Sequence, residues 1–105
     1  MNWLDICALE EINTLGSRII KGPKGDIAIF RTSDDQVFAL DDRCPHKGGP
    51  LSQGLVYGKR VACPLHNWQI DLESGAAQAP DTGCAHHHCA RVEAGRVQLA
   101  LRDAG

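Results

Sequence analysis

The chain lacks three features that would assign it to particular classes of protein. No stretch approaches the roughly 18 consecutive apolar residues of a membrane-spanning helix, so we expect no membrane association. No run of Lys or Arg appears and the formal net charge is −2, which argues against a nucleic-acid-binding surface. The first residues contain neither a basic segment nor a long apolar one. We therefore expect a cytoplasmic protein rather than a secreted one.

Repeats, linkers and low-complexity segments are also absent, and the length predicts a single domain over residues 1–105. Apolar residues at every second position predict short β-strands between glycine- and proline-rich turns. The predicted strands are 26–31, 36–40, 60–62, 68–72, 90–93 and 96–101. The first of these is expected to be covered on both faces, and a short helical candidate spans 9–15. The predicted fold class is therefore all-β, a small sandwich or open barrel.

The cysteines suit a metal site better than a disulfide framework. Their number is odd, and disulfides are rare in the compartment that we expect. At least two of the thiols are therefore predicted to bind metal, whereas Cys7 is expected to be a small buried side chain. The five cysteines are Cys7, Cys44, Cys63, Cys84 and Cys89.

Two short Cys–His pairs are the most informative feature of the sequence. They are Cys44-Pro45-His46 and Cys63-Pro64-Leu65-His66, and residues 47–62 separate them. Two thiolates and two neutral imidazoles, delivered from two loops, are the ligand set of a Rieske [2Fe–2S] centre. The neutral imidazoles make the cluster less negative than an all-cysteine one, which raises its potential to about −150 to +300 mV. We predict that loops 43–51 and 62–69 bind the cluster.

A zinc site uses the same four residue types and stays open at this point. Cys₂His₂ zinc sites usually pair cysteine with cysteine and histidine with histidine, whereas here each cysteine is followed closely by its own histidine. A zinc-stabilised interaction module is therefore the less favoured alternative. Trp68 is expected either to cover the site or to face the core.

These motifs resemble the Rieske ferredoxin-like superfamily. Within it, the chain is most similar to the small subunit of assimilatory NAD(P)H-dependent nitrite reductase. The residues that carry the likeness are Cys-Pro-His-Lys-Gly-Gly-Pro-Leu-Ser-Gln-Gly at 44–54 and Cys-Pro-Leu-His-Asn-Trp-Gln-Ile at 63–70. Weaker support comes from 3–7, 75–77 and 81–84.

The resemblance implies three small antiparallel sheets with a cluster-binding tip formed by two loops. It implies that Cys44 and Cys63 bind the inner iron and that His46 and His66 bind the outer one. It also implies a role in nitrate assimilation, beside a large subunit that carries FAD, a [4Fe–4S] cluster and sirohaem and reduces nitrite to ammonium. The chain would then be a subunit of an oxidoreductase, and no catalytic site of its own is apparent in the sequence.

A free Rieske ferredoxin that supplies a ring-hydroxylating oxygenase is the alternative, with an oxygenase or a flavin reductase as its partner. The cluster would be the same and only the partner would differ. High-potential Rieske proteins carry a loop disulfide and hydroxyl groups beside the cluster, and this sequence lacks both at the matching positions. We therefore expect a potential in the lower part of the Rieske range.

Residues 84–89, Cys-Ala-His-His-His-Cys, contain five side chains that are able to bind metal. Because a strand places alternate residues on opposite faces, His86 and His88 are expected to share one face and His87 and Cys89 the other. We therefore expect neither a second metal site nor a Cys84–Cys89 disulfide. The Asp41-Asp42 pair is predicted to serve the local loop first and a docking surface second.

Overall fold

The structure is a computed structural model, and it describes residues 3–45, 48–64, 68–79 and 82–101. The described residues form nine strands and two short 3₁₀ helices. In chain order these elements are β1 (Leu4–Ala8), η1 (Leu9–Glu11), β2 (Ser17–Gly22), β3 (Gly25–Arg31), β4 (Val37–Asp41), η2 (Leu51–Gln53), β5 (Leu55–Tyr57), β6 (Arg60–Ala62), β7 (Gln69–Asp71), β8 (His87–Glu93) and β9 (Arg96–Ala100). Within the described ranges, no helix has the length and apolar character to cross a membrane.

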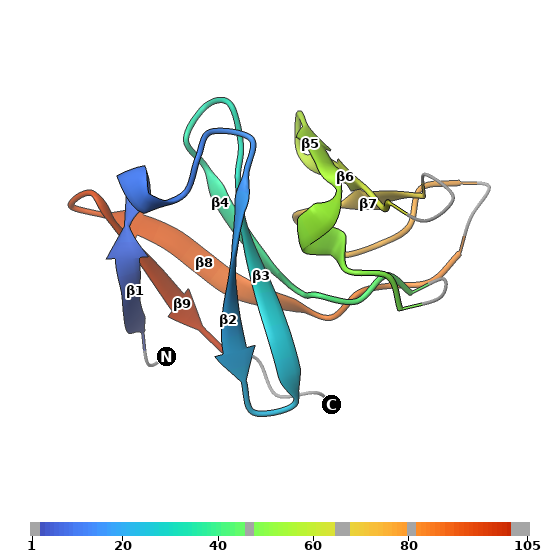
Figure 1. The fold of residues 1–105 in the computed structure, drawn as a ribbon, viewed down its shortest axis with the longest axis horizontal. Helices are drawn as coiled ribbons and strands as arrows, with labels where there is room; N and C mark the ends of the chain where they lie inside the picture. Colours follow the sequence, from blue (N-terminus) through green and yellow to red (C-terminus); the bar gives the residue numbers. More distant parts are fainter. Residues whose placement is uncertain (1–2, 46–47, 65–67, 80–81, 102–105) are drawn as a thin grey trace.

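The strands pair antiparallel in a large and a small sheet. The large sheet has the order β1-β9-β8-β4-β3-β2, and the small one has the order β5-β6-β7. Figure 1 shows the small sheet beside one end of the large one, joined to it by the segments that leave β4 and enter β8. Strand β8 is shared, because its later residues pair with β9 and its first two pair with β4. The large sheet divides at β8 into two halves, and these halves together with the small sheet are the three antiparallel sheets that the resemblance implies. The predicted all-β fold class is confirmed.

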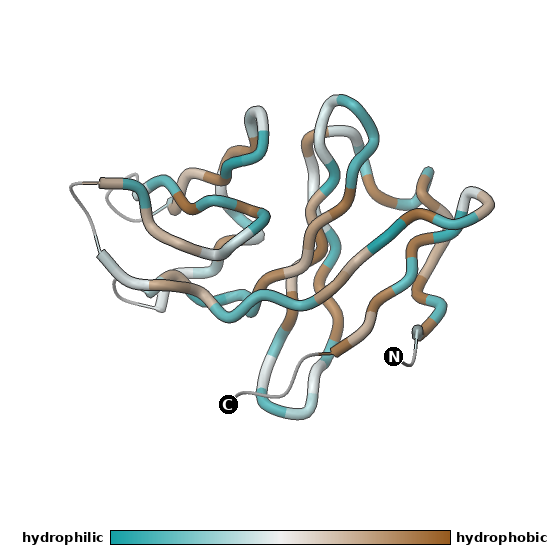
Figure 2. The backbone as a smooth tube through the Cα atoms, turned by 180° about the vertical axis from the view of Figure 1, so that it is seen from behind, coloured by the Kyte–Doolittle hydropathy of each residue, from teal (hydrophilic) through white to brown (hydrophobic). Residues whose placement is uncertain are grey.

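Strand β3 separates two hydrophobic cores. Ile27 and Ile29 face one core, whereas Ala28 and Phe30 face the other. All four side chains are at most 2% exposed, which confirms that this strand is covered on both faces. Figure 2 shows hydrophobic and hydrophilic residues interleaved along the strands of the large sheet. The first core lies among β1, β3, β4 and β9, and the second joins β3 and β4 to the small sheet.

The remaining sequence predictions hold for most strands and fail in three places. The predicted strands 26–31, 36–40, 60–62, 68–72, 90–93 and 96–101 all overlap observed strands. The helical candidate 9–15 is wrong, because only the 3₁₀ turn η1 forms there. Leu101, the last residue of the predicted strand 96–101, follows the end of β9 and is 40% exposed. Strands β1, β2 and β5 were not predicted, because none has clear alternation over enough residues.

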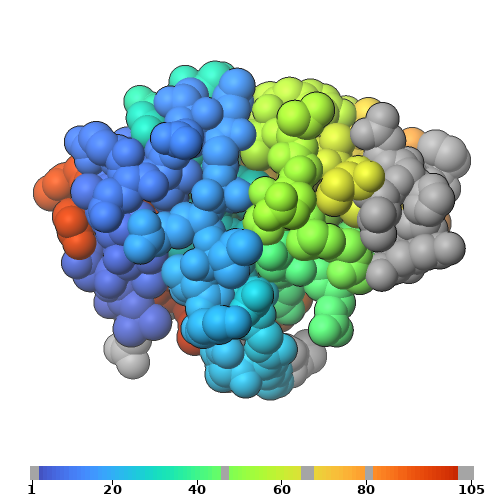
Figure 3. All heavy atoms as spheres, viewed as in Figure 1, coloured from blue at the N-terminus to red at the C-terminus, as the bar shows by residue number. Residues whose placement is uncertain are grey.

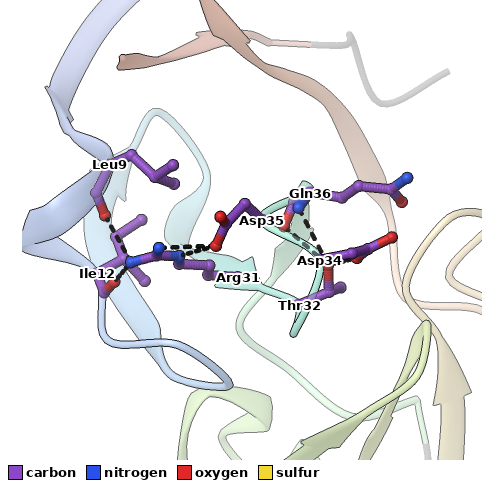
Figure 4. Close-up of polar contacts among 7 residues, drawn as sticks. All are labelled: Leu9, Ile12, Arg31, Thr32, Asp34, Asp35 and Gln36. Atoms are coloured by element: carbon purple, nitrogen blue, oxygen red, sulfur yellow. Dashed lines mark hydrogen bonds and ion pairs between the residues drawn. The ribbon is translucent and has the colours of Figure 1, made fainter.

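Arg31 fixes η1 and the β3–β4 turn to one another (Figure 4). Its Nη1 donates to the carbonyl oxygens of Ile12 at 2.8 Å and Leu9 at 3.3 Å. Its Nε and Nη2 donate to Asp35 Oδ1 at 3.0 and 2.7 Å. The carbonyl group of Ile12, at the end of the turn, gains a hydrogen-bond partner in this way.

The small sheet is held against the edge of the large one through η2. The Ser17 hydroxyl of β2 donates to the carbonyl oxygen of Ser52 in η2 at 2.9 Å. Figure 3 shows the atoms of β2 and of the segment after residue 48 in direct contact on this face. The segment that leaves the first predicted cluster loop is therefore anchored at its far end.

Candidate metal centre

The first predicted loop is closed by its own backbone. Cys44 follows β4 after two residues, and its N–H donates to the carbonyl oxygen of Gly49 at 2.8 Å. Gly48 donates in turn to the carbonyl oxygen of Cys44 at 2.9 Å, with φ +72°. Such a backbone conformation is open to glycine at little cost and strains most other residues. The closure of the loop thus explains the glycine at position 48.

The second predicted loop closes in the same manner. Cys63 follows β6 directly, and its N–H donates to the carbonyl oxygen of Trp68 at 2.6 Å. In both loops a cysteine N–H bonds to the carbonyl group five residues later, and in both a proline follows the cysteine. The cysteine of each Cys–His pair therefore begins a loop that is closed by the same type of backbone hydrogen bond.

The two cysteines share one core. Cys44 and Cys63 are each 1% exposed, neither forms a disulfide, and both belong to the core that also contains Leu51, Ile70 and Leu72. Trp68 packs half-buried against this same core, so it faces the interior as one of the two expectations had it. Two buried cysteine side chains in one core, with no disulfide, form a donor set that suits a metal cluster. The thiolate ligands of such a cluster are shielded from water. His46 and His66 lie outside the described residues.

A third segment packs against the first loop. A side-chain carbon built at Gly83 would meet Pro45 Cβ at 3.0 Å, so the two residues are in close approach. Gly75 donates to the carbonyl oxygen of Asp71 and accepts a hydrogen bond from Ala85, both at 2.7–2.8 Å. The connection from β7 to β8 is therefore folded back over the predicted site.

Two hydrogen-bonded carboxylates, which sequence reasoning did not place at the site, hold the base of the first loop. Asp42 accepts from the N–H and from the hydroxyl of Ser52, at 2.7 Å in each case. Asp41 Oδ1 lies 2.9 Å from Nε2 of His88. The prediction that this acidic pair serves the local loop is confirmed by these contacts. Its only sequence signal was the position of the pair just before Cys44.

The other cysteines and histidines have different surroundings. Cys7 is 2% exposed, which confirms it as a small buried side chain, and burial raises the pKa of its thiol. Cys84 is exposed and precedes β8, whereas Cys89 is half-buried within it. The rings of His86 and His88 meet edge to face at 4.8 Å, in keeping with a shared face. In the part of the chain that the structure describes, no three His, Cys, Asp or Glu side chains are grouped to hold a metal ion.

Comparison with known proteins adds independent information. The sequence pattern described as the Rieske [2Fe-2S] domain matches residues 2–88. The chain is 38% identical over 105 residues to the 3-phenylpropionate/cinnamic acid dioxygenase ferredoxin subunit of Photorhabdus laumondii, with 98% of each chain covered. It is 39% identical over 98 residues to the anthranilate 1,2-dioxygenase ferredoxin subunit of Burkholderia cepacia, with 92% of this chain and 90% of that protein covered.

Other relatives are much longer than this chain. A 46-residue stretch, 44% of this chain, is 48% identical to 4β-methylsterol monooxygenase of Methylococcus capsulatus but spans 12% of that protein. The matches to a methylxanthine N1-demethylase and to a phthalate 4,5-dioxygenase oxygenase subunit, both of Pseudomonas putida, span 23% and 21% of those proteins. The chain therefore corresponds to a minor part of these oxygenases.

Solved structures share the fold over nearly the whole chain. A ferredoxin in complex with the oxygenase of carbazole 1,9a-dioxygenase superposes with a TM-score of 0.80 at 27% identity, covering 93% of this chain and 92% of that one. A protein from Mycobacterium tuberculosis, provisionally assigned as an NADH-dependent nitrite reductase small subunit, gives a TM-score of 0.85 at 24% identity. That match covers 98% of this chain and 97% of the other.

Proposed function

We propose, from the premise that this chain belongs to the Rieske [2Fe–2S] domain family, that Cys44, His46, Cys63 and His66 hold its cluster. The family binds a [2Fe–2S] cluster, and the chain is an electron-transfer domain of that kind. The observation that carries the ligand assignment is the pair of loops that begin at Cys44 and Cys63. Both thiols are buried in one core, and each begins a loop closed by the same backbone bond.

The protein's own residues have two tasks in this function. A bound [2Fe–2S] cluster accepts and releases one electron at a time. Burial keeps the sulfur atoms of Cys44 and Cys63 away from water, and each cysteine is tied by its N–H to the carbonyl group five residues later. Ligands held in this way suit electron transfer, because little structure has to rearrange when the charge changes.

We propose an oxygenase as the acceptor of these electrons, with this chain as its ferredoxin. Two ferredoxin subunits of dioxygenases match nearly the whole chain at 38% and 39% identity. A dioxygenase ferredoxin also shares the fold at 27% identity. This proposal reverses the order that the sequence motifs favoured, because the nitrite reductase subunit matches at 24% identity and its likeness extends to the fold alone.

The small subunit of nitrite reductase is the second candidate. The Lys-Gly-Gly and Asn-Trp residues beside the predicted ligands favour it, and the fold of the Mycobacterium tuberculosis protein agrees over 98% of this chain. Its acceptor would be a large subunit with FAD, a [4Fe–4S] cluster and sirohaem.

The ligand assignment is tested by single serine variants. Cys44→Ser and Cys63→Ser are expected to lose the visible absorption and the EPR signal of the reduced cluster. Cys89→Ser is the matched control, because Cys89 is half-buried in β8 outside both loops, and it is expected to retain both. A full cluster signal in either loop variant would refute the assignment.

The choice of partner is tested by electron transfer from the reduced wild-type protein. Rapid mixing with a ring-hydroxylating oxygenase component is expected to oxidise the cluster, and mixing with a sirohaem nitrite reductase large subunit is expected not to. The opposite pattern would replace the first partner by the second.

A further inference from the structure

We infer that Asp41 and His88 form a positioning pair that fixes the first cluster loop to the large sheet. The inference rests on the proposed function, since it takes Cys44 as a cluster ligand. His88 is one of the few polar residues buried in the described structure, with its side chain 6% exposed. Its Nε2 lies 2.9 Å from Asp41 Oδ1, which joins the start of β8 to the end of β4.

The pair lies where the backbone ladder between β4 and β8 is short. Strands β4 and β8 are in register at two positions, Ala39 with His88 and Leu40 with His87. One further backbone bond runs from the N–H of Asp41 to the carbonyl oxygen of His86 at 2.8 Å. Beyond this point strands β4 and β8 are no longer paired, and the segments that leave β4 and enter β8 lie at the proposed cluster site. The contact between Asp41 and His88 adds a side-chain link to this short ladder.

From Asp41 the chain reaches the predicted ligand in three residues. Arg43 donates to the carbonyl oxygen of Asp41 at 2.7 Å, which forms a tight turn directly before Cys44. The carboxylate of Asp42 holds the other end of the loop through Ser52. Asp41 and Asp42 thus hold the loop from its two ends, the first through β8 and the second through η2.

From His88 the chain leads back to the same loop. His86 and His87 directly precede His88, and residues 82–85 come before them. In this segment, Gly83 lies against Pro45. The ring of His86 packs edge to face on that of His88. The chain after Asp41 and the chain before His88 therefore come together again where Gly83 meets Pro45. The contact between Asp41 and His88 joins the same two segments at their other end.

Two substitutions at one position separate positioning from charge. Asp41→Asn and Asp41→Ala remove the same negative charge, but asparagine keeps an oxygen acceptor in the same place for His88. If the pair positions the loop, only Asp41→Ala is expected to lose the cluster faster, by about tenfold or more under a chelator. Its EPR g-values are also expected to change, while those of Asp41→Asn stay close to wild type.

Thr32→Val is the matched control for loss of stability. Thr32 is a buried polar residue that bonds to Gln36 at the opposite end of β4 from Asp41. This variant is expected to lower the melting temperature without changing the g-values or speeding cluster loss. Equal behaviour of Asp41→Ala and Asp41→Asn, or of Asp41→Ala and Thr32→Val, would overturn the inference.

A further readout follows the backbone instead of the cluster signal. In the holo protein, amide hydrogen exchange over residues 42–44 and 82–86 is expected to speed up in Asp41→Ala and not in Asp41→Asn. If Asp41→Ala does not fold, His88→Leu and His88→Gln give the same comparison, because glutamine retains a donor for Asp41. Unchanged exchange in the disruptive variant would also refute the positioning role. A wild-type protein without a Rieske EPR signal would refute the proposed function instead.

Discussion

At the scale of single residues, the five cysteines fall into groups with distinct chemistry. Cys44 and Cys63 are buried in the core at the small sheet, Cys7 is buried in the other core, and Cys84 and Cys89 have solvent access. Thiolates are the form that binds iron, and burial raises the pKa of the Cys7 thiol, which favours its protonated, inert form. Position in one of the two cores, rather than burial as such, therefore distinguishes the predicted ligands from Cys7.

Cys7 is expected to make the protein less stable at alkaline pH. Burial raises the pKa of its thiol in the folded state, so the folded chain keeps this proton when the unfolded chain has lost it. The free energy of unfolding therefore falls as the pH rises above the ordinary thiol value of about 8.5. Urea titrations between pH 7 and pH 10 are expected to show this loss in wild type and a smaller one in Cys7→Ala. Equal slopes in the two proteins would exclude Cys7 as the cause.

The residues of the two loops predict a low reduction potential. Neither residues 43–51 nor residues 62–69 contain Ser, Thr or Tyr, so no hydroxyl group of these loops can donate to the cluster or to its ligands. Fewer donors leave the more negative, reduced state less stabilised. Redox titration at neutral pH is expected to give a midpoint between about −150 mV and zero. A value well above zero would show that donors from elsewhere supply the missing stabilisation.

At the scale of elements, the β7–β8 connection depends on one close backbone approach. Gly75 has φ +80°, and a side-chain carbon there would overlap the carbonyl oxygen of Ala85. Gly95 has nearly the same φ, +76°, but faces open space. A comparison of these two glycines therefore separates the free-energy cost of the left-handed backbone from the cost of the close approach to Ala85.

Gly75→Ala is expected to destabilise the protein more than Gly95→Ala. Both substitutions place alanine in the left-handed region, at roughly 1–2 kcal/mol each. Gly75→Ala adds about 1–3 kcal/mol, because the connection has to move away from Ala85. The difference is measured as the free energy of unfolding in urea. Equal losses would mean that this connection gives way freely and does not constrain the site.

At the scale of the whole molecule, the two cores on either side of β3 divide the protein into a body and a part that contains the predicted cysteine ligands. Ile27 and Ile29 belong to the body, and Ala28 and Phe30 to the part that contains Cys44 and Cys63. If both loops hold the cluster as proposed, its binding adds free energy to folding, and its removal is expected to loosen the core of Cys44 and Cys63 far more than the other core.

Hydrogen exchange of holo and cluster-free protein checks this division. Removal of the cluster is expected to raise exchange in β5, β6 and β7 and in the connection to β8. Exchange in β1, β9 and the outer half of β8 is expected to change little. A uniform increase across both sheets would show instead that the protein unfolds as one unit.

The sequence was able to predict features that depend on residues close together in the chain. The alternation of 26–31 indicated a strand with two covered faces, and the spacing of the Cys–His pairs indicated two equivalent loops. The contacts that hold these parts together join residues far apart in the chain, such as His88 and Asp41, 47 positions away. Arg31 likewise bonds to backbone carbonyl groups. Since every residue has such a group, the sequence does not indicate which ones accept these bonds. Strand β5 has three residues, too few for a recognisable period.

The most direct test of the account is pulsed EPR of the reduced protein labelled with ¹⁵N at its histidines. If Cys44, His46, Cys63 and His66 hold a [2Fe–2S] cluster, the spectrum is rhombic and shows hyperfine coupling to nitrogen atoms of two histidines. His46→Ala and His66→Ala are each expected to abolish this signal, whereas His86→Ala, outside both loops, is expected to keep it. A reduced cluster without histidine nitrogen coupling, or one that survives in both loop variants, would contradict the assignment.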